Sequence, residues 1–353
     1  MKKIYIQSSC TISIQPSFEE NYFFGEIKEY TENGIKVIDP DYKESIPALQ
    51  LRRMGKSMRM AVYASQKAIQ IAGNPKIDAV ITGTGAGCLR DSEKFVESMW
   101  DNDGGMLNPT PFIQSTHNMA AATVALALGC KGYNMTYTNN ANSFESAVLD
   151  GILYLNENPT QNILIGGLEE SSEQTLAFWK SVGYVNSENP KIPTELNGNS
   201  VGEVISEGAG FFVASATQNE NSLGAILGVK TQFQIENLEE FIFEFLQENE
   251  VSISEIDAVI IGNNGDSRYD SIYQNLSDSI FKEIPQITYK NVFGEFDSVS
   301  SLAVETALKV FKHQEIPEVL KWNGLKNEKY RNILIYNQRR GRNHSLILLE
   351  NEL

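Results

Sequence analysis

The sequence predicts an α/β fold built from two duplicated halves. The segment IDAVITGTGAG at residues 77–87 recurs as IDAVIIGNNGD at residues 256–266, and each copy lies between helical segments. Both copies are apolar strands that end in a glycine-rich turn, so the repetition indicates a duplicated strand-and-helix unit. At 353 residues the chain also exceeds the length at which one hydrophobic core usually stops growing. We therefore expect an N-terminal half over residues 1–217 and a C-terminal half over residues 218–353.

Further apolar runs predict the remaining strands and the helices. The chain begins with an alternating strand pattern, and unbroken Ile, Leu and Val runs follow that are typical of strands covered by helices on both faces. These runs are residues 162–170, 208–216, 224–233, 332–337 and 345–350. Apolar residues at helical spacing predict the helices Ala61–Ala72, Asn118–Leu128, Ser143–Asn156, Leu238–Asn249 and Ser300–Lys312.

The stretch YNMTYTNNANSFESA at residues 133–147 predicts a strand that bends sharply into a helix. Tyr133–Thr138 alternates as a strand does, and Asn139 and Asn140 lie at the bend. Such a turn directs backbone N–H groups and one side chain toward a single point, as in a nucleophile elbow. A carboxamide has no lone pair comparable to that of a thiolate or alkoxide, so Asn140 cannot form an acyl intermediate.

Composition excludes several classes of partner. The formal net charge of −16 argues against nucleic acid, because phosphate binding needs a basic face. The sequence contains no run of about 20 apolar residues, and its start lacks a signal-peptide pattern. The three cysteines have no metal-ligand spacing, and we interpret them as reduced core thiols. We expect a cytoplasmic protein with no stable membrane insertion, no metal and no cofactor.

Several motifs together, in their order and spacing, indicate a family. They are GTGAG, the block NPTPFIQSTHNMAAATVALALGCKGYN, the elbow, GGLEE at residues 166–170, SEGAG at residues 206–210, KNVFGEF and QRRGRNHSLIL. Over nearly its whole length the chain resembles the thiolase superfamily, and within it the β-ketoacyl synthases, which condense acyl groups held on acyl carrier protein. The resemblance implies a thiolase-like fold, with the two halves in a five-layered αβαβα arrangement.

The resemblance also implies that the catalytic side chains have been replaced. In the family the elbow presents a cysteine, and two histidines assist decarboxylation of the malonyl unit. The cysteine falls on Asn140, the first histidine on Gly262 and the second on Glu295. Gly265 and Asp270 of the first histidine's motif are retained, as are Lys290 and Gly294 of the second. The Gly-Phe-Gly-Gly-x-Asn loop that gates the family's pocket reads Gln338 to Asn343, QRRGRN.

The pocket that this alignment predicts contains Asn139, Asn140, Lys290, Glu295 and Arg339. For its members two interpretations stay open. Asn140 is either a hydrogen-bonding plug or a neutral relic, and Lys290 and Glu295 either form an ion pair or face solvent.

The three arginines of the late loop, Arg339, Arg340 and Arg342, suggest a nearby anion in a chain of this charge. They neutralise Glu295 or Asp297, or contact the partner or a phosphopantetheine phosphate, or lie in an exposed loop without a role.

Other polar residues receive structural roles. Glu207 and Asp270 match family positions that support loops. His117 precedes a helix at a position that is not catalytic in the family, so we expect a structural hydrogen bond. His313 and His344 fall where the family has no catalytic group, and surface or core positions suffice for them.

The family contains catalytically degenerate subunits of the chain-length-factor type, which pair with a competent ketosynthase and shape its acyl tunnel. This chain resembles them, and its short length and PFIQSTHN block are similar to the ketosynthase-like partners of aryl polyene and flexirubin pathways. The resemblance implies that the strand Tyr133–Thr138, with Tyr133, Met135, Tyr137 and Thr138, crosses the dimer interface. It places Leu107 and Phe112 beside the tunnel.

A basic segment offers a second contact. Arg52, Arg53 and Lys56 lie on a stretch that we expect to be helical and to continue to Ile71. The segment is either a solvated helix face or a docking patch for acidic carrier protein. Because the overall charge opposes such docking, we expect the competent partner to provide the main carrier site.

Three hypotheses follow. The first is a non-catalytic subunit of a heterodimeric condensing enzyme. The second is a malonyl-carrier decarboxylase or acyltransferase that uses Glu295, Lys290 or His117, although Glu295 would be an anion beside a developing enolate. The third is a homodimeric protein that keeps the pocket for an acyl or lipid ligand.

Overall fold

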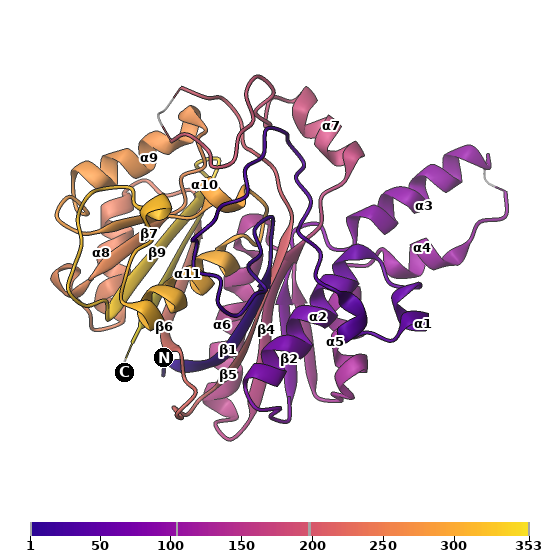
Figure 1. Ribbon diagram of the computed structural model, residues 1–353, viewed down its shortest axis with the longest axis horizontal. Coiled ribbons are helices and arrows are strands. Elements are labelled where there is room, and N and C mark those ends of the chain that lie inside the picture. The colour runs from indigo at the N-terminus through magenta and orange to yellow at the C-terminus, as the bar shows by residue number, and fades with distance from the viewer. Residues whose placement is uncertain (1, 104, 197–198, 352–353) are drawn as a thin grey trace.

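Ten strands form one mixed sheet in the computed structural model, which describes residues 2–103, 105–196 and 199–351 (Figure 1). The strand order is β3-β2-β4-β5-β1-β6-β10-β9-β7-β8. The strands are β1 (Ile4–Ile12), β2 (Ala79–Gly83), β3 (Tyr133–Tyr137), β4 (Asn162–Glu169), β5 (Gly208–Ser215), β6 (Gly224–Phe233), β7 (Ala258–Ile261), β8 (Gln286–Thr288), β9 (Asn332–Arg339) and β10 (Asn343–Glu350).

The strand order confirms the duplication that the sequence predicts. The first five strands follow the order 3-2-4-5-1 from one edge of the sheet, and the last five follow the same order from the other edge. The halves meet where β1 pairs antiparallel with β6, from Ile4 opposite Ile226 to Ile6 opposite Gly224. The boundary that we place between residues 217 and 218 stays a prediction.

Helices cover both faces of each half-sheet (Figure 1). One buried cluster packs α2 (Lys56–Ile71) and α5 (Met119–Leu128) on the outer face of the N-terminal half. Another packs α8 (Leu238–Glu248) and α9 (Ser267–Asp278) on the outer face of the C-terminal half. The third joins the inner faces of both halves to α6 (Ser143–Glu157) and α11 (Ser300–His313). The layers therefore run helix, sheet, helix, sheet, helix.

The remaining elements are short or peripheral. They are α1 (Ala48–Leu51), α3 (Leu89–Asp101), α4 (Pro109–Gln114), α7 (Glu173–Ser181), α10 (Lys290–Phe293) and the 3-10 turns η1 (Tyr42–Glu44), η2 (Asn140–Asn142), η3 (Ile253–Glu255) and η4 (Glu318–Leu320). Within the described part of the chain, no helix has the length and apolar character needed to cross a membrane.

The five predicted helices are present as α2, α5, α6, α8 and α11. The expectation that the basic segment is one helix running to Ile71 is wrong. Gly55 adopts an extended conformation with ψ of 170°, so α1 ends at Leu51 and α2 begins at Lys56. Arg52 and Arg53 therefore lie in the turn between two helices.

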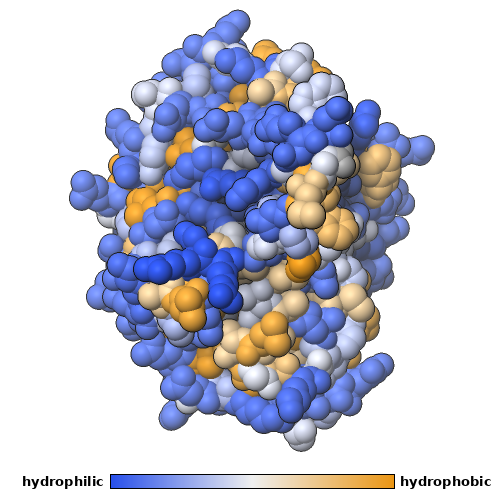
Figure 2. Space-filling view, turned by 90° about the vertical axis from the view of Figure 1, so that its right-hand side faces the viewer, coloured by the Kyte–Doolittle hydropathy of each residue, from blue (hydrophilic) through white to orange (hydrophobic). Residues whose placement is uncertain are grey.

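Helices α3 and α4 project from the body of the molecule (Figure 1). They pack on each other through Phe95 and Phe112, whose ring centroids are 5.1 Å apart, and α3 has no buried residue. Figure 2 looks onto the side from which they project and shows apolar patches among hydrophilic surface. The apolar faces of this pair of helices are uncovered in the isolated chain.

Candidate functional site

The bend between β3 and α6 has the geometry of an elbow. Asn140 begins η2 with a φ of +47°, a left-handed conformation that non-glycine residues rarely adopt and that is often found at functional sites. The Ser143 hydroxyl donates to the carbonyl of Asn140 at 2.6 Å and accepts from the backbone N–H of Asn139 at 2.8 Å. The turn is thus fixed by its own backbone and by the first residue of α6.

Strand β2 approaches this bend so closely that only glycine fits. A Cβ atom on Gly83 would lie 2.1 Å from the carbonyl oxygen of Ser143, which belongs to the backbone and cannot move aside. The missing side chain therefore brings the end of β2 into direct contact with the start of α6.

The elbow faces outward in the isolated chain. Thr138, Asn139 and Asn140 are all exposed, and β3 is an edge strand that pairs only with β2. The Asn139 side chain donates to the hydroxyl of Ser146 at 3.3 Å, whereas the Asn140 carboxamide makes no hydrogen bond with the residues that the structure describes. This geometry does not support the interpretation of Asn140 as a hydrogen-bonded plug.

A side chain at Gly262, where the alignment predicts the family's first histidine, would overlap its neighbours. A Cβ atom on Gly262 would lie 2.3 Å from Oδ1 of Asn337 and 2.8 Å from the hydroxyl of Tyr273. Asn337 is buried, and the Tyr273 hydroxyl accepts from the backbone N–H of Gln338 at 2.9 Å. Two neighbouring side chains therefore occupy the volume into which an imidazole would extend.

The second histidine position holds a buried ion pair. Nζ of Lys290 lies 2.8 Å from Oε2 of Glu295, and each residue is 1% exposed. The Asn264 side chain donates to the same carboxylate oxygen at 2.7 Å. This result confirms the ion pair over the solvent-facing alternative. A carboxylate engaged in this way cannot readily act as a base.

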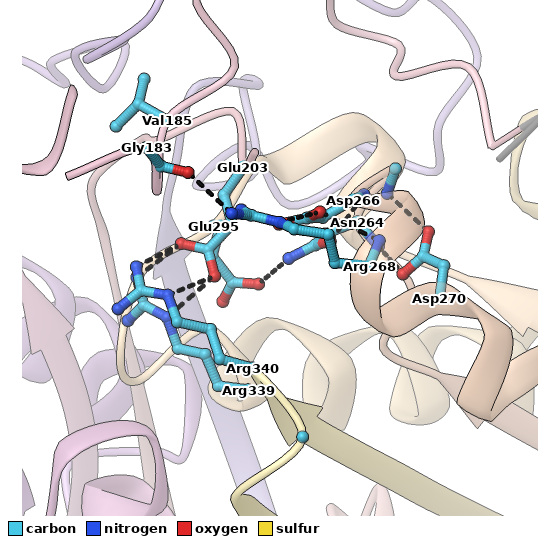
Figure 3. Close-up of polar contacts among 12 residues, drawn as sticks. Gly183, Val185, Glu203, Asn264, Asp266, Arg268, Asp270, Glu295, Arg339 and Arg340 are labelled. Atoms are coloured by element: carbon cyan, nitrogen blue, oxygen red, sulfur yellow. Dashed lines mark hydrogen bonds and ion pairs between the residues drawn. The ribbon is translucent and has the colours of Figure 1, made fainter. Parts of the chain in front are cut away.

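Two of the three arginines of the late loop, Arg339 and Arg340, bind carboxylates (Figure 3). Arg339 pairs with Asp297, as one interpretation predicts, and also with Glu203, which Arg340 binds too. Burial raises the pKa of Glu203, but the charges of Arg339 and Arg340 outweigh burial and hold that pKa below its usual value. Sequence reasoning missed Glu203 because no motif surrounds it and 136 residues separate it from Arg339.

Asp297 also lies close to a second carboxyl group, that of Glu169. Glu169 accepts hydrogen bonds from the Thr84 hydroxyl at 3.0 Å and from the backbone N–H groups of Gly85 and Ala86. Burial and the charge of Asp297 raise the pKa of Glu169 to about 8. Glu169 and Asp297 line a cavity of about 20 Å³, which is room for roughly one water molecule.

Glu207 and Asp270 support loops, as the resemblance implies. Asp270 accepts from the backbone N–H groups of Asn264 and Gly265 at 3.1 and 2.7 Å. Burial raises the pKa of Asp270 to about 6 even though both N–H groups lower it. Glu207 accepts from the backbone N–H groups of Val37 and Ser171, each at 3.1 Å.

The three histidines take no part in the site. His117 is exposed and makes no hydrogen bond with the described residues, so the expected structural bond is absent there. His344 is buried, with Nδ1 3.0 Å from the hydroxyl of Tyr336. His313 stacks on Phe23 at a centroid distance of 4.0 Å.

The residues expected at the interface and tunnel differ in exposure. Met135 and Phe112 are exposed, while Leu107, Tyr133 and Tyr137 are half-buried. Of the residues expected to dock carrier protein, Arg52 and Arg53 are exposed. Lys56 pairs instead with Asp39 and with buried Glu207, each at 3.1 Å.

A family comparison agrees with this architecture. The model of the β-ketoacyl synthase N-terminal domain matches residues 17–219, more than half of the 353-residue chain. The chain therefore belongs to the β-ketoacyl synthase family. It is 24% identical over 202 residues to 3-oxoacyl-[acyl-carrier-protein] synthase 2 of Synechocystis sp. (strain PCC 6803), a match that covers 54% of this chain and 49% of that protein. The match spans about half the length of this relative.

Solved structures share the fold over the full chain. The ishigamide ketosynthase/chain length factor has a TM-score of 0.83 at 16% identity and covers 100% of both chains. A chain of the ketosynthase in complex with its chain length factor from Xenorhabdus doucetiae has a TM-score of 0.76 at 15% identity, covering 99% of this chain and 98% of that one. A β-ketoacyl synthase from Burkholderia phymatum has a TM-score of 0.77 at 15% identity and covers 100% of both chains. At these identities the likeness establishes the fold.

The crowding at Gly262 predicts the effect of restoring a histidine. Gly262→His should lower the free energy of unfolding by about 1–3 kcal/mol or more, because the new side chain overlaps Asn337 and Tyr273. Adding Asn337→Ala should recover part of this loss, which urea denaturation of both variants measures. Gly324→Ala is the control, since a Cβ there meets nothing within 4 Å. Equal stabilities of Gly262→His and Gly324→Ala would contradict the crowding.

The raised pKa of Glu169 predicts a pH dependence of stability. The folded chain holds this proton up to a pH of about 8, whereas the unfolded chain releases it near the ordinary glutamate pKa of 4.5. Between these values the folded state binds more protons, so its stability falls as pH rises, by up to about 1.4 kcal/mol per pH unit. Glu169→Gln should flatten this slope in urea denaturation between pH 5.5 and 8.5, and exposed Glu195→Gln should not. An unchanged slope in Glu169→Gln would contradict the assignment.

Proposed function

We propose that this chain is a non-catalytic, chain-length-factor-type subunit that pairs with an active β-ketoacyl-carrier-protein synthase and shapes its acyl tunnel during chain elongation. The observation that carries the proposal is the filled catalytic space. Asn337 and Tyr273 occupy the first histidine's volume, and the second position holds the closed Lys290–Glu295 pair. The fold is retained while each side chain required for condensation is absent.

The same geometry weighs against an enzyme of the decarboxylase or acyltransferase type. Decarboxylation of a malonyl group leaves an enolate, which needs hydrogen-bond donors aimed at its oxygen. Lys290 is a donor, but its charge is neutralised by Glu295 and its side chain is inaccessible. Asn140 supplies no nucleophile for acyl transfer.

An uncovered apolar surface supports a protein partner. Trp100 of α3 and Leu126 of α5 are 87% and 82% exposed, and further exposed apolar residues on or near α3, α4, β3 and α6 are Met106, Phe112, Ile113, Met135, Leu149 and Leu153. Large exposed apolar patches on globular proteins mark interaction sites. The free edge of β3 lies in this surface and offers unpaired backbone groups to a second strand. We assign this face to the competent ketosynthase.

Carrier protein fits better on that partner. Acyl carrier protein is acidic, and this chain has a net charge of −16, so approach is unfavourable over most of its surface. Arg52 and Arg53 are the exposed remainder of the expected docking patch, since Lys56 is engaged by Asp39 and Glu207. The chain would then contribute a minor contact to a carrier bound mainly by the partner.

The PFIQSTHN block favours a pathway of the aryl polyene or flexirubin type.

The assignment of the interface predicts how a charge on it acts. Leu126→Asp should weaken partner binding by at least about 30-fold, as expected of a central interface residue, without changing thermal stability. Phe243→Asp is the matched control, because Phe243 is an exposed apolar residue, 42% accessible, on α8 of the opposite outer layer. Titration calorimetry with the co-expressed ketosynthase measures both. Equal affinities for the two variants would contradict this interface.

The loss of the histidines predicts that the nucleophile alone does not restore activity. Asn140→Cys, paired with a ketosynthase whose own cysteine is replaced, should yield no condensation product, because no imidazole assists decarboxylation here. Mass spectrometry of the carrier-bound acyl chains gives the readout, and the intact partner serves as the positive control. Turnover by the Asn140→Cys complex comparable to that control would overturn the proposal.

A further inference from the structure

Two consecutive arginines at the end of β9 bind the carboxylate of Glu203 (Figure 3). Its carboxylate accepts from Nε and Nη2 of Arg339 at 3.4 and 3.1 Å, and from Nε and Nη2 of Arg340 at 3.1 and 2.7 Å. Glu203 is 1% exposed and Arg339 is 6% exposed, so water competes little for these bonds. Guanidinium groups bind carboxylates most strongly in this two-pronged arrangement.

The segment that carries Glu203 pairs with residues 184–186, which belong to the same connection between α7 and β5. The backbone N–H of Glu203 donates to the carbonyl of Tyr184 at 2.8 Å, and its carbonyl accepts from the N–H of Asn186 at 2.9 Å. The ring centroid of Tyr184 lies 3.8 Å from the guanidinium carbon of Arg340. Two paired segments thus hold Arg340, one by the carboxylate of Glu203 and the other by the aromatic face of Tyr184.

The other side of the contact is the turn between β9 and β10. Arg340 and Gly341 adopt φ angles of +54° and +65°, and the N–H of Gly341 donates to the Gln338 side chain at 2.7 Å. Arg339 also reaches Asp297, two residues beyond Glu295. In Figure 3 the Glu295 carboxylate lies between the two guanidinium groups and Asn264. The β9–β10 turn therefore lies beside Glu295.

We propose that Glu203 is a latch, which binds Arg339 and Arg340, holds the β9–β10 turn closed over Glu295 and keeps a pantetheine-borne acyl group out of this subunit. The inference rests on the proposed function, because in that function carrier protein delivers its acyl chain to the partner and not to this subunit. It goes beyond that function in one respect. Exclusion arises from an ionic contact at the turn and is independent of the missing nucleophile at Asn140.

The latch accounts for the placement of two charges next to each other in sequence. One arginine would supply a two-pronged pair of hydrogen bonds to the Glu203 carboxylate. Two consecutive arginines attach both the end of β9 and the turn that follows it to this carboxylate. Removing the Glu203 charge leaves both guanidinium groups without this counterion in a low-dielectric site, so the turn gains by moving toward water. Removing Arg340 alone, whose side chain is 20% exposed, loosens the outer half of the contact only.

Hydrogen exchange of the whole chain tests the latch. In Glu203→Gln, the amides of residues 338–343 should exchange at least about tenfold faster than in the unchanged chain, while those of β4 and β5 keep their protection. Arg340→Gln should accelerate the exchange of the same amides to a smaller extent, because Arg339 keeps its pair with Glu203, and it decides the matter if Glu203→Gln loses protection throughout. The control is Glu195→Gln, which removes an exposed carboxylate from the same segment, paired with Lys191 at 3.0 Å. Unchanged exchange of residues 338–343 in Arg340→Gln, or in a folded Glu203→Gln, would overturn the latch.

Chemical access gives a second measurement. Gln338 is 3% exposed, so in Gln338→Cys the thiol should react slowly with iodoacetamide and at least about tenfold faster when Glu203→Gln is added. Equal rates would overturn the proposal.

A measurement of binding to a ketosynthase distinguishes a failure of the proposed function from a failure of the latch. Failure of the unchanged chain to bind a ketosynthase would contradict the proposed function, while the exchange and alkylation rates would still decide the latch.

Discussion

Close backbone contact between the strands and the two central helices sets the position of every group in the site. Gly83 admits the Ser143 carbonyl, and Gly167 lies against Phe144 of α6 on one side and Ser298, just before α11, on the other. Side chains at these glycines would push the helices away from the half-sheets. Both half-sheets therefore pack on the same two helices, α6 and α11.

Charge pairing fills the region around Glu295, where the alignment predicts the family's second histidine. Lys290 and Glu295 neutralise each other, and Asn264 completes the carboxylate's hydrogen bonds. Arg339 joins Asp297 to Glu203 in the neighbouring cluster. Buried pairs of this kind contribute little net stability compared with apolar packing, but breaking one is strongly destabilising.

The fold and part of the site could be predicted from the sequence, whereas specific contacts in the site could not. Strands with unbroken apolar runs and the repeated glycine turns were sufficient to predict the duplicated fold. The Lys290–Glu295 pair was foreseeable as one of two alternatives, because both residues fall within one short motif. Glu203 was not foreseeable, because 136 residues separate it from Arg339 and no motif surrounds it. The crowding at Gly262 depends on side chains of β9 and α9, which no local pattern reveals.

The central claim is that this chain works as the silent half of a heterodimer. The most direct test is affinity purification of the tagged chain from the cells that produce it, followed by protein mass spectrometry and light scattering of the eluate. The account predicts an equimolar partner of the same family that carries the elbow cysteine and both histidines. Recovery of a homodimer or monomer alone, in cells that express such a ketosynthase, would contradict it.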